Sequence, residues 1–310
     1  MDEAPPLDGV EDWLNGGPVA LDDHADGPVL LHFWRYASDA CLRDLPVLHR
    51  LHETYDQLTV AGVHAPRFGF EAARENVAAA VDRYDIPYPV GLDVEGAAWE
   101  RYGNMHRPRT VLVGSDGRVR EEVMGAGRMA DVEDAARRLL RRAAAVPDDR
   151  VTAADGRDDG RHPAVSPVVY AGAVHGGPLG NDHPVAPHTT VEFEDGGDHR
   201  MNRLYLDGPW RREEDCVVTE SGGRAAVRFA GSACGAVLGP SDGTVTVRLA
   251  GGPVPDTMWG DDIVSVNGAT RVDLDMPRLY HLVERGEPRV AELELVADDG
   301  PVRLYACTFR

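Results

Sequence analysis

A single cysteine stands where a short apolar strand is predicted to turn into a helix. Residues 28–46 read PVLLHFWRYASDACLRDLP, and Cys41 falls in the first turn of the predicted helix. A cysteine at a helix start can react as a thiolate, because the helix dipole favours its charged form. Disulfide exchange needs a second thiol to resolve the mixed disulfide, but Ser38 stands three residues before Cys41. This spacing allows one-thiol chemistry at most.

The polar residues around Cys41 each have two interpretations. Ser38 is favoured as a cap for the free N–H groups of the helix start, and its hydroxyl could instead bond to the Cys41 sulfur. Asp39 could cap the same helix or repel a thiolate. Arg35 and Arg107 could offset that negative charge, although solvated surface groups are the favoured interpretation.

The charge of the chain is large, negative and evenly distributed. The chain holds 52 acidic and 32 basic residues for a net charge of −20, and every basic residue is Arg. Residues 1–150 and residues 151–310 each carry −10. An even negative charge is typical of adaptation to high salt, where ions screen the self-repulsion. An acidic protein from a GC-rich genome is the alternative, and either origin argues against nucleic acid as a partner.

The sequence predicts neither a membrane span nor a metal framework. No stretch reaches the ~18 apolar residues of a span. The start MDEAPPLDGVEDW lacks the basic and apolar regions of a signal peptide, so we expect a cytoplasmic location. The four cysteines, at 41, 216, 234 and 307, have no paired spacing, which argues against a disulfide framework or a zinc ribbon. We expect no cofactor.

The patterning predicts two domains joined by a linker. Residues 1–147 alternate apolar strands with helical segments, including a buried strand over 29–34, a helix from Cys41 to about residue 55, and a hairpin at GSDG. Residues 148–164 are polar and aperiodic, as a linker is. Residues 165–310 hold many short β-rich runs separated by Gly, Asp and Pro. We predict an α/β fold followed by an all-β sandwich with a jelly-roll-like arrangement.

Several of these runs carry a family resemblance. The runs HFWRYASDACLRDLP, VAGVHAPRFGFE and RPRTVLVGSDGRV resemble the TlpA/ResA-like branch of the thioredoxin superfamily. With NRLYLDGPWR, VLGPSDG and LYACTF, the whole chain is similar to the soluble C-terminal part of DipZ-type thiol–disulfide proteins. The resemblance implies a thioredoxin-like domain followed by a β-sandwich likened to a carbohydrate-binding module.

The resemblance also assigns roles to particular residues. It implies a cis peptide bond at Pro108, facing the thiol site, and a kink of the first helix at Pro46. The family's attacking cysteine falls on Ser38, and only its second cysteine is kept, as Cys41. The acid that the family buries behind that cysteine falls on His32. An imidazolium at His32 would lower the pKa of the thiol, whereas the favoured alternative is a buried, unreactive thiol beside a core histidine.

Two functions follow from these residues. The first is a thiol–disulfide oxidoreductase-like protein with a degenerate S-x-x-C site, retaining one-thiol chemistry at most through Cys41 near Pro108 and acting on a thiol or disulfide partner protein. The second is a non-catalytic module that binds a protein or a glycan through the thioredoxin-like groove and the sandwich. Nothing in the sequence determines the oligomeric state.

The second domain offers weaker candidates. A Gly- and Pro-rich loop brings together three histidines, but their spacing fits no standard metal site; they are His175, His183 and His188. Five aromatic residues could form a sugar-stacking platform, although core positions are the favoured interpretation; they are Tyr170, Tyr205, Trp210, Trp259 and Tyr280. The remaining cysteines are predicted to be buried thiols, with a bridge between two of them as the alternative.

Overall fold

The structure is a computed structural model that describes residues 2–10, 12–21, 27–141, 150–151, 165–181, 188–239 and 243–310. Its internal contacts divide the chain into two compact units, Met1–Arg161 and His162–Arg310. Of the predicted linker over 148–164, only residues 150 and 151 are described.

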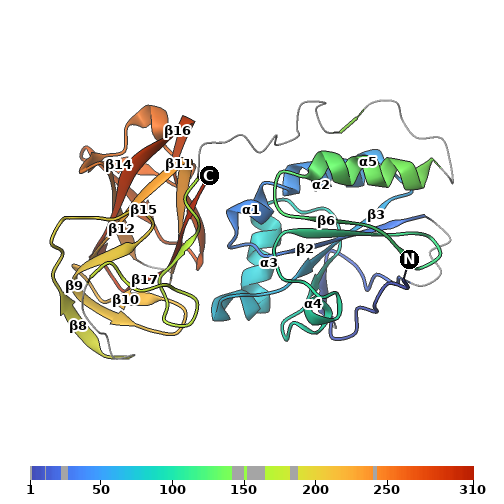
Figure 1. The fold of residues 1–310 in the computed structure, drawn as a ribbon, viewed down its shortest axis with the longest axis horizontal. Helices are drawn as coiled ribbons and strands as arrows, with labels where there is room; N and C mark the ends of the chain where they lie inside the picture. Colours follow the sequence, from blue (N-terminus) through green and yellow to red (C-terminus); the bar gives the residue numbers. More distant parts are fainter. Residues whose placement is uncertain are drawn as a thin grey trace. The chain divides into compact units, whose positions relative to one another are not determined.

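The first unit is a six-stranded mixed sheet flanked by helices (Figure 1). Its strand order is β1-β4-β3-β2-β5-β6, in which β2, β3 and β4 are parallel while β5 and β6 form an antiparallel hairpin. This arrangement is the predicted thioredoxin-like fold. The strands are β1(Asp12–Leu14), β2(Val29–Trp34), β3(Thr59–His64), β4(Val90–Leu92), β5(Arg109–Val113) and β6(Val119–Met124). The helices are α1(Asp39–Leu42), α2(Leu45–Thr54), η1(Gly69–Ala72), α3(Arg74–Arg83), α4(Ala97–Arg101) and α5(Met129–Leu140).

Strand β2 lies at the centre of this sheet and is buried along its whole length, as predicted. Successive side chains of a strand point to opposite faces. One face packs Leu31 and Phe33 against Ala98 of α4. The other face is covered by α2 and α5, which are joined by hydrogen bonds from Tyr55 to Glu133 and from Arg137 to Tyr55 (Figure 1). A strand covered on both faces is expected to be apolar throughout, and His32 is the exception.

The predicted first helix is divided at the proline. Helix α1 ends at Leu42, and α2 begins at Leu45 with Pro46 in its first turn. Proline has no N–H to continue an earlier helix, but its fixed φ suits a helix start. Between the two helices, Asp44 takes the N-cap position of α2 and becomes buried. The break therefore turns a carboxylate toward the interior.

The second unit is an all-β structure whose strands are hydrogen-bonded in the order β14-β15-β12-β16-β11-β17-β10-β9-β8. The strands are β7(Val169–Tyr170), β8(Thr190–Phe193), β9(Leu204–Arg212), β10(Val217–Thr219), β11(Arg224–Gly239), β12(Thr244–Leu249), β13(Gly252–Pro253), β14(Val264–Val266), β15(Ala269–Asp273), β16(Arg278–Asp299) and β17(Val302–Phe309). A short turn of 3₁₀ helix, η2(Asp256–Met258), lies between β13 and β14.

The two longest strands, β11 and β16, pair with each other along most of the length of β11. The first part of β11 pairs with β9, while its last part, after a register shift between Gly231 and Ala233, pairs with β17. A bulge bends a strand and allows it to pass from one layer to the next. The layers enclose a core that includes Trp210, Phe229 and Leu293. The prediction of a strand-rich sandwich is confirmed.

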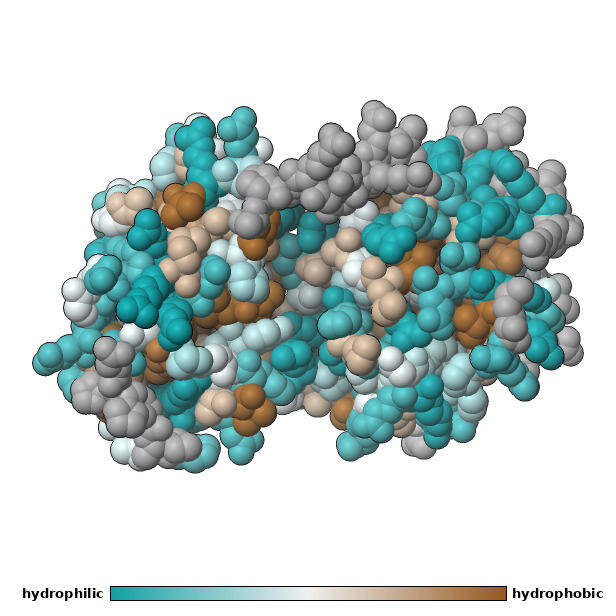
Figure 2. Space-filling model, viewed as in Figure 1, coloured by the Kyte–Doolittle hydropathy of each residue, from teal (hydrophilic) through white to brown (hydrophobic). Residues whose placement is uncertain are grey.

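The visible face of both units is predominantly hydrophilic (Figure 2). Figure 2 shows hydrophilic residues over most of the visible face, with apolar patches small and interrupted. Scattered exposed apolar side chains are normal for a folded protein. Within the described residues, no helix is both long and apolar enough to cross a membrane.

Candidate thiol site

The polar corner after β2 places Cys41 in the interior of the first unit. The Cys41 side chain is 0 % exposed. Its backbone N–H donates to the Ser38 carbonyl at 3.0 Å, which closes the first turn of α1. All four cysteines lie in described parts of the chain, and each is a buried, free thiol. The prediction of buried thiols in the second unit is therefore confirmed.

Ser38 takes the N-cap position of α1, but its side chain does not cap the helix. Its backbone is extended, with φ −131° and ψ 112°. The hydroxyl receives no hydrogen bond from the N–H groups of the first turn, all of which are described. It acts on Cys41 instead, where it lowers the pKa of the thiol. The favoured capping interpretation is therefore wrong for the side chain.

The pKa of Cys41 is set by opposing effects. Burial is the largest, and it raises the thiol pKa above its ordinary value. The Ser38 hydroxyl, a backbone hydrogen bond with Arg35 and the Arg35 charge all lower it, whereas Asp44 raises it. The net effect is a raised pKa, so the resting group is a protonated thiol at neutral pH.

His32 is a neutral imidazole, which corrects the idea that its charge activates the thiol. It is 0 % exposed, and burial lowers its pKa to about 3. Its Nδ1 lies 3.1 Å from the Thr110 hydroxyl on β5, and its Nε2 has no hydrogen-bond partner within the described residues. An imidazolium in this apolar sheet centre would lose its hydration without gaining a counter-charge. His32 therefore fits the predicted core histidine.

A buried ion pair stabilises the backbone of the corner between β2 and α1. Arg35 Nη1 lies 3.1 Å from Glu71 Oε2, and both side chains are buried. Glu71 also accepts the backbone N–H groups of Ala37, Arg67 and Phe68 at 3.0 to 3.2 Å. Burial raises the pKa of Glu71, but Arg35, the neighbouring His64 and these N–H groups outweigh it and hold the pKa low. The expectation of a solvated Arg35 is thus wrong.

Arg107 and Pro108 come just before strand β5. The Arg107–Pro108 bond is cis, as the resemblance implied. The Arg107 guanidinium lies 3.7 Å from the centre of the Trp99 ring, a cation–π distance. Burial, followed by repulsion from Arg35, lowers its pKa to about 10, while Cys41 and Glu71 oppose that shift. Arg107 is therefore a half-buried cation within electrostatic reach of the thiol.

Asp44 is a site residue that sequence reasoning missed. It is 2 % exposed, and burial raises its pKa to about 7, against the lowering effects of Arg43 and a Gly127 backbone hydrogen bond. One of its carboxylate oxygens, Oδ2, has no partner within the described residues. The available signal was its spacing, because Asp44 follows Cys41 by three residues and shares its side of the first helix.

The candidates in the second unit do not form a site. His175 and His188 are described, His183 lies outside the described residues, and no group of three metal-binding side chains occurs in the described ranges. Of the aromatic residues, Tyr205, Trp210 and Tyr280 are buried, as the core interpretation predicted. Tyr170 and Trp259 are partly exposed, so no continuous described platform results.

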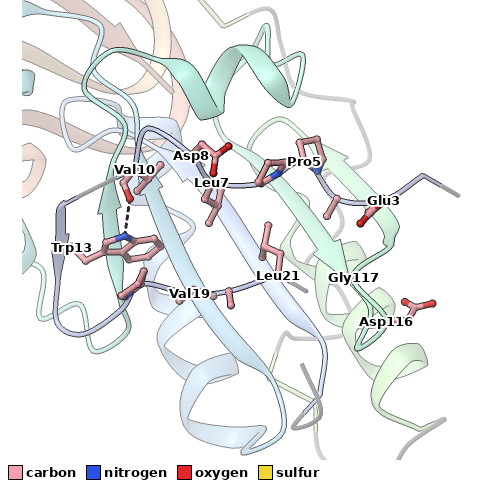
Figure 3. Close-up of a pocket in the computed structure, with 14 residues that line it drawn as sticks. Glu3, Pro5, Leu7, Asp8, Val10, Trp13, Val19, Leu21, Asp116 and Gly117 are labelled. Atoms are coloured by element: carbon pink, nitrogen blue, oxygen red, sulfur yellow. Dashed lines mark hydrogen bonds between the residues drawn. The ribbon is translucent and has the colours of Figure 1, made fainter. Parts of the chain in front are cut away.

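One large cavity of the first unit lies away from the thiol. It has a volume of about 760 Å³ and lies between the extended segments 3–10 and 18–21. Figure 3 shows Leu7, Val19 and Leu21 along it, with the Trp13 indole donating to the Val10 carbonyl. Cys41 and its neighbours do not line this cavity.

Comparison with known proteins places both units in described families. The AhpC/TSA family matches residues 2–122, and the thioredoxin like C-terminal domain matches residues 166–309. Protein DipZ of Mycobacterium tuberculosis is 34% identical over 142 residues, which are 44% of this chain and 20% of that protein. The thiol-disulfide oxidoreductase ResA of Bacillus thuringiensis is 26% identical over 121 residues, 39% of this chain and 68% of ResA.

A solved thioredoxin-like protein in its oxidized form is 26% identical, with a TM-score of 0.43 over 46% of this chain and 97% of that one. The chain spans about a fifth of the length of the DipZ proteins it matches. The chain thus carries an AhpC/TSA family domain followed by a thioredoxin like C-terminal domain, and its first unit is similar to the DipZ and ResA proteins.

Proposed function

We propose that the protein carries out one-thiol disulfide chemistry through Cys41, with Ser38 in place of the second thiol. The observation that supports the proposal is the Ser38 hydroxyl, which does not cap the helix backbone and lowers the pKa of the Cys41 thiol. A hydroxyl that donates to a sulfur stabilises the thiolate more than the thiol. The same group favours the reactive form each time the site admits a partner.

The proposed reaction is a single exchange. The Cys41 thiolate attacks one sulfur of a partner disulfide, a new S–S bond to Cys41 forms, and the partner's S–S bond breaks. The leaving sulfur takes the electron pair and then a proton. Since Ser38 cannot resolve the mixed disulfide, a second thiol from outside the chain must attack it and release Cys41.

The burial of Cys41 favours a second function. A thiol that is 0 % exposed with a raised pKa reacts slowly at rest. The alternative is a non-catalytic module that binds a protein or a glycan and uses Cys41 only as a packing residue.

Alkylation kinetics separate the two functions. The folded protein would be labelled with iodoacetamide across a pH series, and each cysteine quantified by mass spectrometry. Cys216, Cys234 and Cys307 are buried internal references. One-thiol chemistry predicts labelling of Cys41 ahead of these references in the folded protein. Protection of Cys41 until the first unit unfolds would favour the binding module.

A further inference from the structure

Several guanidinium groups lie near Arg107, in a strongly negative protein. The groups that act on Arg107 are Arg35, Arg67, Glu71 and Cys41. Arg35 and Arg67 repel Arg107 and Glu71 attracts it, while the chain as a whole carries −20. The protein has 52 acidic residues, so a cluster of cations departs from the average charge of its surface. Such a departure indicates a local function.

Arg107 lacks the carboxylate partner that two nearby arginines have. In the cluster Arg35 pairs with Glu71 at 3.1 Å, and two residues along the chain from Arg107, Arg109 pairs with Glu122 at 2.9 Å. Among the described residues Arg107 pairs with no carboxylate; it stacks on Trp99 and makes one long hydrogen bond, 3.4 Å from Nη2 to the Pro66 carbonyl. Its Nε is buried without a partner in the same set of residues. A desolvated guanidinium without a counter-ion is costly unless a ligand supplies the negative charge.

We propose that Arg107 binds the carboxylate of the partner that reacts with Cys41, and that this partner is a small disulfide or thiol with a carboxylate close to its sulfur. The inference rests on the proposed one-thiol function and names its substrate class. A guanidinium recognises a carboxylate through paired N–H donors. A small molecule is favoured over a protein disulfide because Cys41 is fully buried and leaves little room for a folded partner.

The geometry gives Arg107 a second effect on the reaction. Cys41 raises the pKa of Arg107, so the cation and the sulfur stabilise each other when the sulfur is charged. A carboxylate bound by Arg107 would place the attached disulfide next to Cys41. The same guanidinium would stabilise the Cys41 thiolate as it forms. Arg107 is a binding and positioning residue in this scheme, and the proton and electron transfers remain those of the exchange at Cys41.

A pair of matched probes tests the proposal. Dithiodiglycolate carries a carboxylate next to each sulfur, and bis(2-hydroxyethyl) disulfide is neutral; the mass increase at Cys41 would be timed for each in the intact protein. The wild type should favour the anionic probe. Arg107→Gln should lower the anionic-to-neutral rate ratio by about tenfold, the loss typical of a hydrogen bond to a charged group. Arg107→Lys should keep part of the preference.

A control separates site binding from general attraction. Arg43→Gln removes one positive charge from the same corner, where Arg43 is 41% exposed and pairs with Asp39 at 3.1 Å. This variant should leave the ratio unchanged, and the wild-type ratio should survive high salt, which screens distant charges. An equal ratio in wild type and Arg107→Gln would overturn the proposal. Failure of both probes to modify Cys41 would instead overturn the one-thiol function and this proposal with it.

Discussion

The strongest prediction concerns Glu71, because a single carboxylate holds the whole corner. Its Oε2 accepts Arg35 and the N–H groups of Arg67 and Phe68, while Oε1 accepts the N–H of Ala37. In Glu71→Gln the side chain keeps its shape but loses its charge and one acceptor. The buried Arg35 is then left without its counter-ion, and at least one N–H group faces an amide donor.

The expected cost follows from the burial of the pair. Removing one partner of a buried ion pair costs about 3–5 kcal/mol, since the remaining charge stays desolvated. At an m-value of about 2 kcal/mol/M, the urea midpoint of the first unit should fall by about 2 M. The matched control is Asp12→Asn, which breaks the Arg74 pair whose side chains are 55% and 47% exposed. An exposed pair contributes about 0–1 kcal/mol.

Thiol accessibility provides the assay, because it reports on each unit separately. A rise of Cys41 labelling above its rate in the folded protein reports unfolding of the first unit, and labelling of Cys234 and Cys307 reports unfolding of the second. When labelling is followed against urea, Glu71→Gln should lower the unfolding midpoint reported by Cys41. The midpoints reported by Cys234 and Cys307 should stay unchanged. A cost below about 1 kcal/mol, equal to that of Asp12→Asn, would refute the reasoning that this ion pair is an essential support.

Three further outcomes are expected. Ser38→Cys should form a disulfide with Cys41 and gain insulin-reducing activity with a chemical reductant; a folded but inert variant would show that the groove is not competent for exchange. Ser38→Ala should raise the apparent pKa of Cys41 labelling further, by about one unit, because the hydroxyl that lowers the thiol pKa is lost; an unchanged profile would contradict the role of the hydroxyl. His199, 4% exposed between Asp195 and Glu292, has a pKa that burial lowers but the two carboxylates raise more strongly. Its stabilising charge is fully present below the unfolded pKa of about 6.5 and is lost as pH rises through the raised folded pKa, so His199→Gln should destabilise the second unit more at pH 6 than at pH 9. Urea midpoints at the two pH values measure this difference, and equal losses would refute it.

Local sequence patterns were sufficient for the main elements of the fold. Strand β2 and the hairpin β5–β6 follow directly from apolar runs and the GSDG turn. Periodicity located the first helix but not its break, because the helical pattern continues across Pro46 whereas the hydrogen bonds do not; the kink at Pro46 was expected only from the family resemblance. Strand β1 was missed, since its three residues are fixed by pairing with β4 and not by their own pattern.

The candidate site depended more on distant contacts. The partner of Arg35 is Glu71, 36 residues later, and the contact of His32 is Thr110, 78 residues later. A pKa depends on burial and on such neighbours, so no local pattern could show that His32 is neutral or that Asp44 titrates near pH 7. The cation at Arg107 was visible in the sequence, but its stacking on Trp99 was not.

The sequence by itself determined that the corner holds one thiol, because covalent chemistry depends on residue type and Ser38 cannot take the place of a sulfur. It also determined the alternation of strands and helices and the even acidic charge. The tertiary structure decided how that thiol is solvated, which charges face it, and where the Ser38 hydroxyl points. These properties depend on groups that the fold brings together across the sheet. The interactions between these groups become strong only in the folded interior, from which water is excluded.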